Sequence, residues 1–301
     1  MKKILVTGGA GFIGSQLVEH LSKKNYVTVI DNLSQGNKIK NINKNIKIIK
    51  GDVRDNKLID YHSRNCSSIF HLAAVLGVDV VSKKNVETME CEFEGLKNVC
   101  NAAKKNKIKK IIYSSSSGVY GKLNYKGNVK EDVVISPVSA YAIAKRSCEI
   151  YLKYFYLENK IDSIAVRLFN VYGPGQDTRM VIPRFIQQAK NDKPITIYGY
   201  GKQTRDFTYI DDCVRVFDLI NKKINGFKIL NSSRGQDFSV NELAKVIKKK
   251  FTSKSKIIHI KVPNNLEEFQ VMKRSGNSSK LRNLIGYKPH TNLMDGLKKI
   301  V

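Results

Sequence analysis

Tyr141 and Lys145 are the two side chains of this sequence whose types and spacing are best suited to proton transfer. On an α-helix, residues four apart project from the same face, so the phenol and the ammonium can approach one another. A free phenol has a pKa of about 10, and moving it to about 7 requires roughly 4 kcal/mol of preferential stabilisation of the phenolate. The lysine charge can supply much of this. Tyr141 is therefore a candidate general base, although the same spacing also occurs on ordinary surface helices.

The N-terminal segment has the order strand, glycine-rich turn, helix. The apolar run 4–7 is followed by glycines at positions 8, 11 and 14 and by apolar residues with helical spacing. Such glycines let the backbone approach a pyrophosphate, and the helix N-terminus supplies amide donors. A second strand, 27–30, ends at Asp31, where a carboxylate accepts both ribose hydroxyls of an adenosine and repels a 2′-phosphate. The pattern predicts a dinucleotide site for NAD rather than NADP.

Strands and helices continue to alternate after this unit. We expect strands at 46–49, 69–74 and 110–113 and a helix over 86–105, hence a doubly wound parallel α/β sheet of the Rossmann type. Ligands of such sheets bind beyond the carboxyl ends of the strands. Asp52 follows the third strand and could meet the adenine or simply cap a helix, and His71 is more typical of a packed residue. The predicted cofactor-binding residues are Gly8, Gly11, Phe12, Ile13, Gly14, Asp31, Asn32, Asp52, Val53, Leu72, Ala73, Ala74, Tyr141 and Lys145.

Composition limits the classes of protein that this chain can belong to. Its 301 residues are 42% hydrophobic, enough for a large core, and no run approaches the ~20 apolar residues of a membrane helix. The N-terminus enters a strand directly, so we expect no cleavable signal and a cytoplasmic protein. Five cysteines without paired spacing predict neither a metal site nor a disulfide framework.

The net charge of +27 is compatible with nucleic-acid binding, but the lysines are spread along the chain without stacking aromatics, so we expect no specific nucleic acid and no membrane partner.

Further motifs extend the pattern over essentially the whole chain. A serine run, Ser114–Ser117, precedes Gly-Val-Tyr-Gly at 118–121, and Arg-Leu-Phe-Asn-Val-Tyr-Gly-Pro-Gly occupies 167–175. Together with the glycine turn, Asp31 and the Tyr141 segment, these motifs resemble the extended short-chain dehydrogenase/reductase family, in its nucleotide-sugar epimerase/dehydratase branch. The resemblance implies that Ser116 hydrogen-bonds the reacting sugar oxygen, that Tyr141 is the base, and that Lys145 holds the nicotinamide ribose and lowers the tyrosine pKa.

The resemblance also implies how the chain is divided. Residues 1–174 would bind NAD, with 208–234 returning to that domain, and 175–301 would form a smaller α/β domain for the nucleotide-sugar. Asn170 would offer its amide to the substrate, and Arg205 and Arg274 are candidate diphosphate ligands, because guanidinium groups match phosphate oxygens in pairs. In similar proteins the helix that begins near Tyr141 joins a four-helix bundle with a second subunit. We therefore expect a homodimer, the alternative being a monomer with a well-buried helix.

The expected reaction is epimerisation at C4 of a UDP-hexose through a transient 4-keto sugar. Dehydratases of this branch place an Asp-Glu pair after the catalytic hydroxyl residue, and UDP-glucuronate decarboxylases place a glutamate before Val-Tyr-Gly. Ser117 and Gly118 occupy these positions here and cannot act as carboxylates. Glu92, where relatives usually carry asparagine, is the carboxylate most able to restore such chemistry, and Asn277 replaces a common aspartate. A dehydratase, decarboxylase or ketoreductase, and a non-enzymatic NAD- or nucleic-acid-binding protein of the same fold, are the alternatives.

Overall fold

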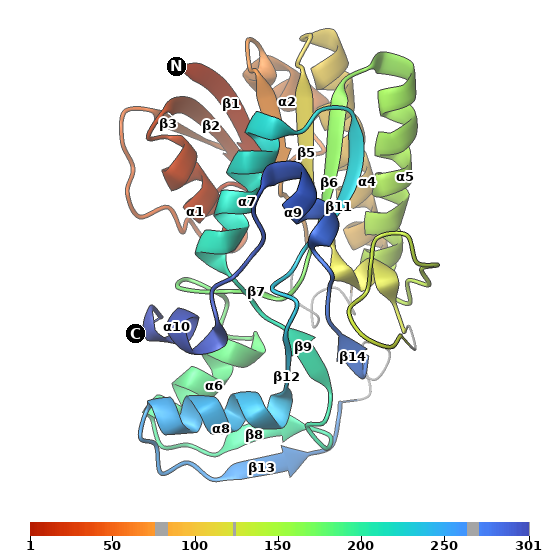
Figure 1. Cartoon of the computed structure of the whole chain (residues 1–301). Helices are drawn as coiled ribbons and strands as arrows, with labels where there is room; N and C mark the ends of the chain where they lie inside the picture. The colour runs from red at the N-terminus through yellow and green to blue at the C-terminus, as the bar shows by residue number, and fades with distance from the viewer. Residues whose placement is uncertain (76–83, 123–124, 264–270, 301) are drawn as a thin grey trace.

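The computed structural model describes residues 1–75, 84–122, 125–263 and 271–300, which form two lobes (Figure 1). The larger lobe contains a seven-stranded sheet in the order β11-β6-β5-β4-β1-β2-β3, with every neighbouring pair parallel. The predicted doubly wound Rossmann-type sheet is thus confirmed. Its strands are β1 (Lys2–Thr7), β2 (Asn25–Asp31), β3 (Ile46–Lys50), β4 (Ser68–His71), β5 (Lys110–Ser116), β6 (Asp162–Leu168) and β11 (Phe227–Ser232).

Helices cover both faces of this sheet because alternate side chains of each buried strand point to opposite faces. In β1, Ile4 and Val6 belong to the apolar core beneath α1 and α7, whereas Leu5 belongs to the core beneath α2, α4 and α5. These helices are α1 (Phe12–Leu21), α2 (Asn56–Ser63), α4 (Asn85–Lys105), α5 (Ala140–Asn159) and α7 (Ile210–Lys223), and the short 3₁₀ helix η1 (Ser117–Tyr120) follows β5.

The smaller lobe lies beyond the carboxyl ends of the strands (Figure 1). It is built from α6, α8 and short sheets, while α9 packs on α7 and β11 of the larger lobe. A capping box between Ser239 and Glu242 starts α8, as the sequence predicts. The remaining elements are β7 (Val171–Tyr172), α6 (Val181–Lys190), β8 (Ile195–Tyr198), β9 (Thr204–Asp206), β10 (Thr208–Tyr209), β12 (Asp237–Ser239), α8 (Val240–Lys250), β13 (Ile257–Ile260), β14 (Lys273–Arg274), α9 (Ser279–Ile285) and α10 (Leu293–Lys298).

The chain passes to the smaller lobe after β6 and returns through α7 and β11, the edge strand of the large sheet. The domain boundary at residue 174 stays a prediction. Within the described ranges, no helix has the length and apolarity needed to cross a membrane.

Candidate active site

Two adjoining cavities lie at the carboxyl ends of the central strands. The larger, of about 400 Å³, is lined by the glycine turn, the serine run, Tyr141, Lys145 and residues of the smaller lobe. The smaller, of about 230 Å³, is lined by the ends of β2 and β3 and by the segment after β4. Gly8, Gly11 and Leu72 belong to the walls of both. Each of the fourteen predicted cofactor residues lines one of the two cavities, and their contacts with a cofactor stay a prediction.

The glycine turn fits a dinucleotide because side chains are sterically excluded from it. Gly8 has φ +69°, and a Cβ there would lie 2.5 Å from the Ala73 nitrogen. A Cβ on Gly14 would lie 2.1 Å from the Gly8 oxygen. Gly11, the N-cap of α1, makes no side-chain cap hydrogen bond, so amides of the first helical turn can face a pyrophosphate. The residues present therefore suit the cofactor that the sequence predicts.

Two carboxylates hold fixed positions in the smaller cavity. The Asp31 oxygens accept hydrogen bonds from the Ala10 and Leu33 amides at 2.9 and 2.8 Å, which leaves further lone pairs for ribose hydroxyls. Asp52 pairs with Arg54 at 2.7 Å, and this hydrogen bond lowers the pKa of the Asp52 carboxyl. Asp52 is not a helix cap, since Asp55 caps α2.

Tyr141 is positioned by the first turn of α5. The Ser139 hydroxyl accepts a hydrogen bond from the Ala142 amide and starts the helix, so Tyr141 and Lys145 follow on the wall of the larger cavity. The Lys145 ammonium lies 5.5 Å from the Tyr141 ring centroid and donates to the Ser114 carbonyl at 2.8 Å. Burial raises the pKa of Tyr141, while the Lys145 charge and a hydrogen bond with Ser116 act to lower it. The lysine therefore acts on the phenol in the predicted direction, and burial outweighs it in the protein alone.

The serine run presents its hydroxyls to different partners. The Ser114 hydroxyl donates to the His71 carbonyl at 3.2 Å, and the Ser115 hydroxyl donates to Glu149 at 2.7 Å. The Ser116 oxygen accepts the Gly118 amide at 3.0 Å, and its hydroxyl hydrogen-bonds Tyr141 at the wall of the larger cavity. This distribution supports Ser116, rather than Ser114 or Ser115, as the group that meets a substrate oxygen.

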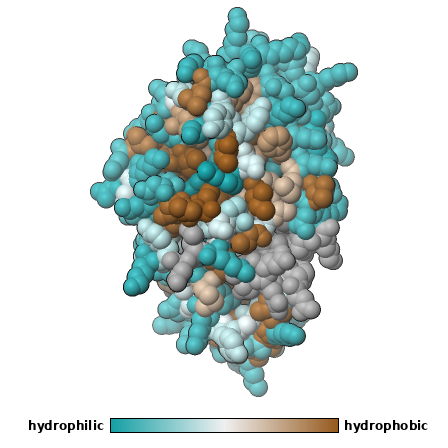
Figure 2. All heavy atoms as spheres, turned by 90° about the vertical axis from the view of Figure 1, so that its right-hand side faces the viewer, coloured by the Kyte–Doolittle hydropathy of each residue, from teal (hydrophilic) through white to brown (hydrophobic). Residues whose placement is uncertain are grey.

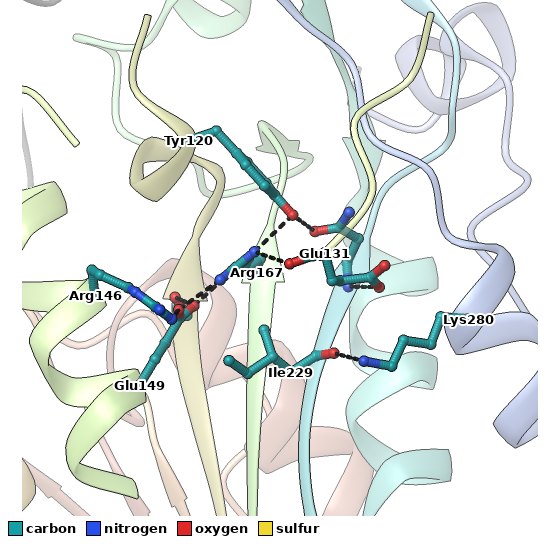
Figure 3. A network of polar contacts seen from close by, with 9 residues as sticks. Tyr120, Glu131, Arg146, Glu149, Arg167, Ile229 and Lys280 are labelled. Carbon is teal, nitrogen blue, oxygen red and sulfur yellow. Dashed lines mark hydrogen bonds and ion pairs between the residues drawn. The ribbon is translucent and has the colours of Figure 1, made fainter. Parts of the chain in front are cut away.

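A buried ion pair holds α5 against β6 (Figure 3). Arg167 of β6 donates two hydrogen bonds to Glu149 of α5, both of 2.8 Å. It also donates to the Tyr120 hydroxyl at 2.9 Å and to the Glu131 carbonyl. Because Glu149 accepts the Ser115 hydroxyl as well, this network fixes the serine run relative to the helix that carries Tyr141.

Glu92 lies behind the site rather than in it. Its carboxylate is fully buried, 2.9 Å from the Lys145 ammonium, and accepts the Tyr113 hydroxyl at 3.1 Å. Glu92 is not among the described residues that line either cavity, so it does not supply the missing acid of a dehydratase or decarboxylase. His71 is a packed residue, as expected: it is fully buried beside Thr7, and burial, assisted by the Lys145 charge, lowers its pKa to about 3.

The substrate side of the larger cavity differs from the prediction at one arginine. Asn170 and Arg274 line it, but Arg205 does not, because its guanidinium donates to the Thr204 and Val271 carbonyls at 2.8 and 2.6 Å. Burial lowers the pKa of Arg274 to about 10, and the nearby Arg205 charge lowers it in the same direction. The buried Arg274 Nε has no hydrogen-bond partner among the described residues. An uncompensated guanidinium is suited to an anion, so Arg274 rather than Arg205 is the candidate diphosphate ligand.

Sequence reasoning missed the loops that close this cavity between the lobes. Arg179 donates to Gln35 at 3.0 Å, and the Lys38 ammonium donates to the Gly175 carbonyl at 2.9 Å. Asp177 is the single carboxylate among the described residues that line the cavity. Its hydrogen bond with Arg179 lowers its pKa to about 2, so it stays ionised at neutral pH. These residues match no sequence motif. The polar, turn-rich composition of their loops is the only signal in the sequence that could have indicated them.

Comparison with known proteins gives consistent matches. The model of the NAD dependent epimerase/dehydratase family matches residues 4–231. The chain is 36% identical to a UDP-N-acetyl-α-D-glucosaminuronate decarboxylase of Bacillus cytotoxicus, over 100% of this chain and 97% of that protein. It is 35% identical to a putative UDP-glucose 4-epimerase of Methanocaldococcus jannaschii, over 99% and 97%. The crystal structure of UDP-glucose 4-epimerase with UDP-glucose from Thermotoga maritima superposes with a TM-score of 0.93 at 31% identity, over 99% and 97% of the two chains.

Proposed function

From the premise that the chain belongs to the NAD dependent epimerase/dehydratase family, we propose that it epimerises a UDP-hexose at C4. The predicted family and its cofactor, NAD, are confirmed by this membership. The finer assignment is supported by one observation above all: Ser116, Tyr141 and Lys145 converge on a cavity that adjoins the glycine turn.

The chain's own residues hold and move a proton at the 4-hydroxyl of the sugar. Ser116 donates its hydroxyl proton to the sugar oxygen, and Tyr141 as phenolate accepts the proton of the 4-hydroxyl and later returns it. Lys145 remains charged and stabilises the phenolate. NAD, held by the glycine turn and Asp31, would supply the acceptor and the donor of the C4 hydride. Asn170 and Arg274 are the candidate ligands of the substrate.

The walls of the cavity favour epimerisation over dehydration. A 4,6-dehydratase must take a proton from C5 and deliver one to C6, which requires a further acid and base. Asp177, the only carboxylate that the described lining offers, is held ionised by Arg179 and cannot donate a proton at neutral pH. No such acid is needed to return the hydride to C4.

Decarboxylation is the second candidate function, favoured by the 36% identity to the Bacillus cytotoxicus decarboxylase. Oxidation at C4 of a uronate produces a β-keto acid, which can lose carbon dioxide, so Ser116, Tyr141 and Lys145 would serve either reaction. The two functions therefore share the base and differ in the substrate that is admitted and in the glutamate that decarboxylases place before Val-Tyr-Gly, where this chain has Gly118.

A substrate panel separates these functions. We expect UDP-glucose and UDP-galactose, or their N-acetyl forms, to interconvert without added reductant, with chromatography and mass spectrometry as the readout. UDP-glucuronate and its 2-acetamido counterpart should release no carbon dioxide, and dTDP-glucose should give no 4-keto-6-deoxy sugar. Catalytic release of carbon dioxide would replace the epimerase proposal with the decarboxylase.

Asp31 is expected to select NAD over NADP. In calorimetric titrations of the cofactor-free protein, NAD should bind at least about tenfold more tightly, because a charged hydrogen bond contributes about 1.5–3 kcal/mol. Asp31→Ala should reduce the ratio of the NAD and NADP affinities to within a few-fold. Glu87→Ala, which removes a half-buried carboxylate from the same cavity, should leave this affinity ratio unchanged. Equal affinities in the unaltered protein would show that Asp31 does not face the ribose.

The proposed homodimer would form through the outer faces of α4 and α5, which pack side by side. Apolar patches are exposed on this side of the molecule (Figure 2). On α5 the spacing of Ile143, Ile150, Tyr154 and Leu157 places them on one face, and each is more than 40% exposed. Contiguous exposed apolar surface of this kind is typical of an interaction site.

Ile150→Glu should convert the dimer to a monomer, because it places a charge in the centre of this face. Sedimentation velocity at matched concentrations measures the change. Tyr200→Glu is the control, since Tyr200 is 85% exposed in the smaller lobe, and it should remain dimeric. A monomeric unaltered protein, or a dimeric Ile150→Glu, would rule out this interface.

A further inference from the structure

We propose that Glu92 is a positioning residue that holds the charged Lys145 beside Tyr141 and, through its own charge, sets the pH range in which Tyr141 acts as the base. The inference deepens the proposed function and rests on the role of Tyr141 in it. It assigns a part in the reaction to a carboxylate that touches neither cavity.

The contacts of Lys145 carry the first step. Its side chain is 1% exposed and that of Glu92 is fully buried, with 2.9 Å between the Nζ and Oε2 atoms. The ammonium also donates a hydrogen bond to the Ser114 carbonyl. Two strong acceptors therefore hold the ammonium, which is 4.6 Å from the Tyr113 ring centroid and 5.5 Å from that of Tyr141. A lysine held in this way cannot swing out of the site without leaving a buried carboxylate unpaired.

The second step concerns the other titratable groups that face this pair. His71 from β4, Tyr113 from β5, Cys148 from α5 and Cys91 from α4 surround it. Burial keeps each of them neutral at physiological pH. It lowers the pKa of His71 to about 3, raises the pKa of Cys91 to about 11 and that of Cys148 to about 12, and raises the pKa of Tyr113 well above its usual value. Burial raises the pKa of Glu92 as well, whereas the Lys145 charge and the hydrogen bonds from Lys145 and Tyr113 act to lower it. Paired with the ammonium at 2.9 Å, Glu92 is the single anion set against Lys145 among the described groups here.

The third step is the sign of the effect. The Lys145 charge lowers the pKa of Tyr141 and the Glu92 charge raises it. Burial acts to lower the pKa of Lys145, and the Glu92 carboxylate, together with Tyr141, more than offsets it. Removing the carboxylate should therefore lower the pKa of Tyr141, because the lysine charge then acts undiminished. It should also lower the pKa of Lys145, so both limbs of a pH–rate profile should move to lower pH.

The test compares Glu92→Gln, which keeps the shape of the side chain, with the unaltered protein. The ultraviolet titration curve of each NAD-loaded protein is measured, and the curve of the same protein carrying Tyr141→Phe is subtracted from it. The difference reports the ionisation of Tyr141 alone among the 14 tyrosines. We expect the Tyr141 midpoint to fall by about one pH unit in Glu92→Gln. Glu90→Gln, on the same helix but exposed and outside both cavities, should not change it. An unchanged or higher midpoint in Glu92→Gln would overturn the proposal.

This titration needs no sugar, so it reports on Glu92 even if the proposed epimerisation is wrong. The pH–rate profile with the UDP-sugar is a separate measurement, and there both limbs should shift to lower pH in Glu92→Gln. If Glu92→Gln does not fold, nitrogen NMR of Lys145 in the unaltered protein takes its place. The Nζ should remain a charged ammonium throughout the active pH range, and a neutral amine there would refute the ion pair on which the proposal depends.

Discussion

Tyr141→Phe should lower the epimerisation rate by about 10²- to 10⁴-fold, the usual effect of removing a general base. The phenylalanine ring fills the same space in the wall of the larger cavity, so NAD should stay bound. Steady-state kinetics with the UDP-sugar measures the loss, and the absorbance of extracted NAD measures the retained cofactor.

Tyr154→Phe is the matched control for this substitution. Tyr154 lies on the same helix but is 55% exposed and away from both cavities, so its hydroxyl should be dispensable. Retention of more than half the rate in Tyr141→Phe would remove Tyr141 from the role of base.

Arg167→Met should destabilise the protein by about 3–5 kcal/mol, the cost of leaving one partner of a buried ion pair alone. The methionine fills part of the space, but Glu149 loses two hydrogen bonds of 2.8 Å while staying fully buried (Figure 3). Urea unfolding followed by circular dichroism gives the change in the free energy of unfolding.

Arg146→Met is the control, because Arg146 donates a single hydrogen bond to the same carboxylate and its side chain is 33% exposed. It should cost less than about 1 kcal/mol. The double substitution Arg167→Met with Glu149→Leu should recover much of the loss, since no buried charge then remains. Equal losses in Arg146→Met and Arg167→Met would mean that the buried pair does not hold α5 in place.

The features that the sequence predicts correctly are those encoded locally. The glycine turn, the position of Asp31 at the end of β2 and the Tyr141–Lys145 spacing each depend on a short stretch of chain whose conformation follows from its own residues. The alternation of strands and helices then fixes the sheet, and with it the edge at which these stretches meet.

Features that depend on packing between distant segments could not be predicted in the same way. Glu92 and Lys145 meet because α4 packs against α5, and nothing in either helix specifies that partner. Arg205 and Arg274 are register neighbours on β9 and β14. The carbonyls of Thr204 and of the distant Val271 bind Arg205, whereas Arg274 faces the cavity. The contact between Gln35 and Arg179 joins loops of different lobes.

Incubation with UDP-[4-²H]glucose, or its N-acetyl counterpart, tests the central claim most directly. Epimerisation returns the hydrogen of C4 to C4 on the opposite face, so NMR should find the deuterium at C4 of the galacto product. The product should keep the full mass of the substrate. C4 epimerisation by this chain would be contradicted by deuterium at C6 or by loss of the label to water. It would also be contradicted if the corresponding uronate gave a product lighter by carbon dioxide.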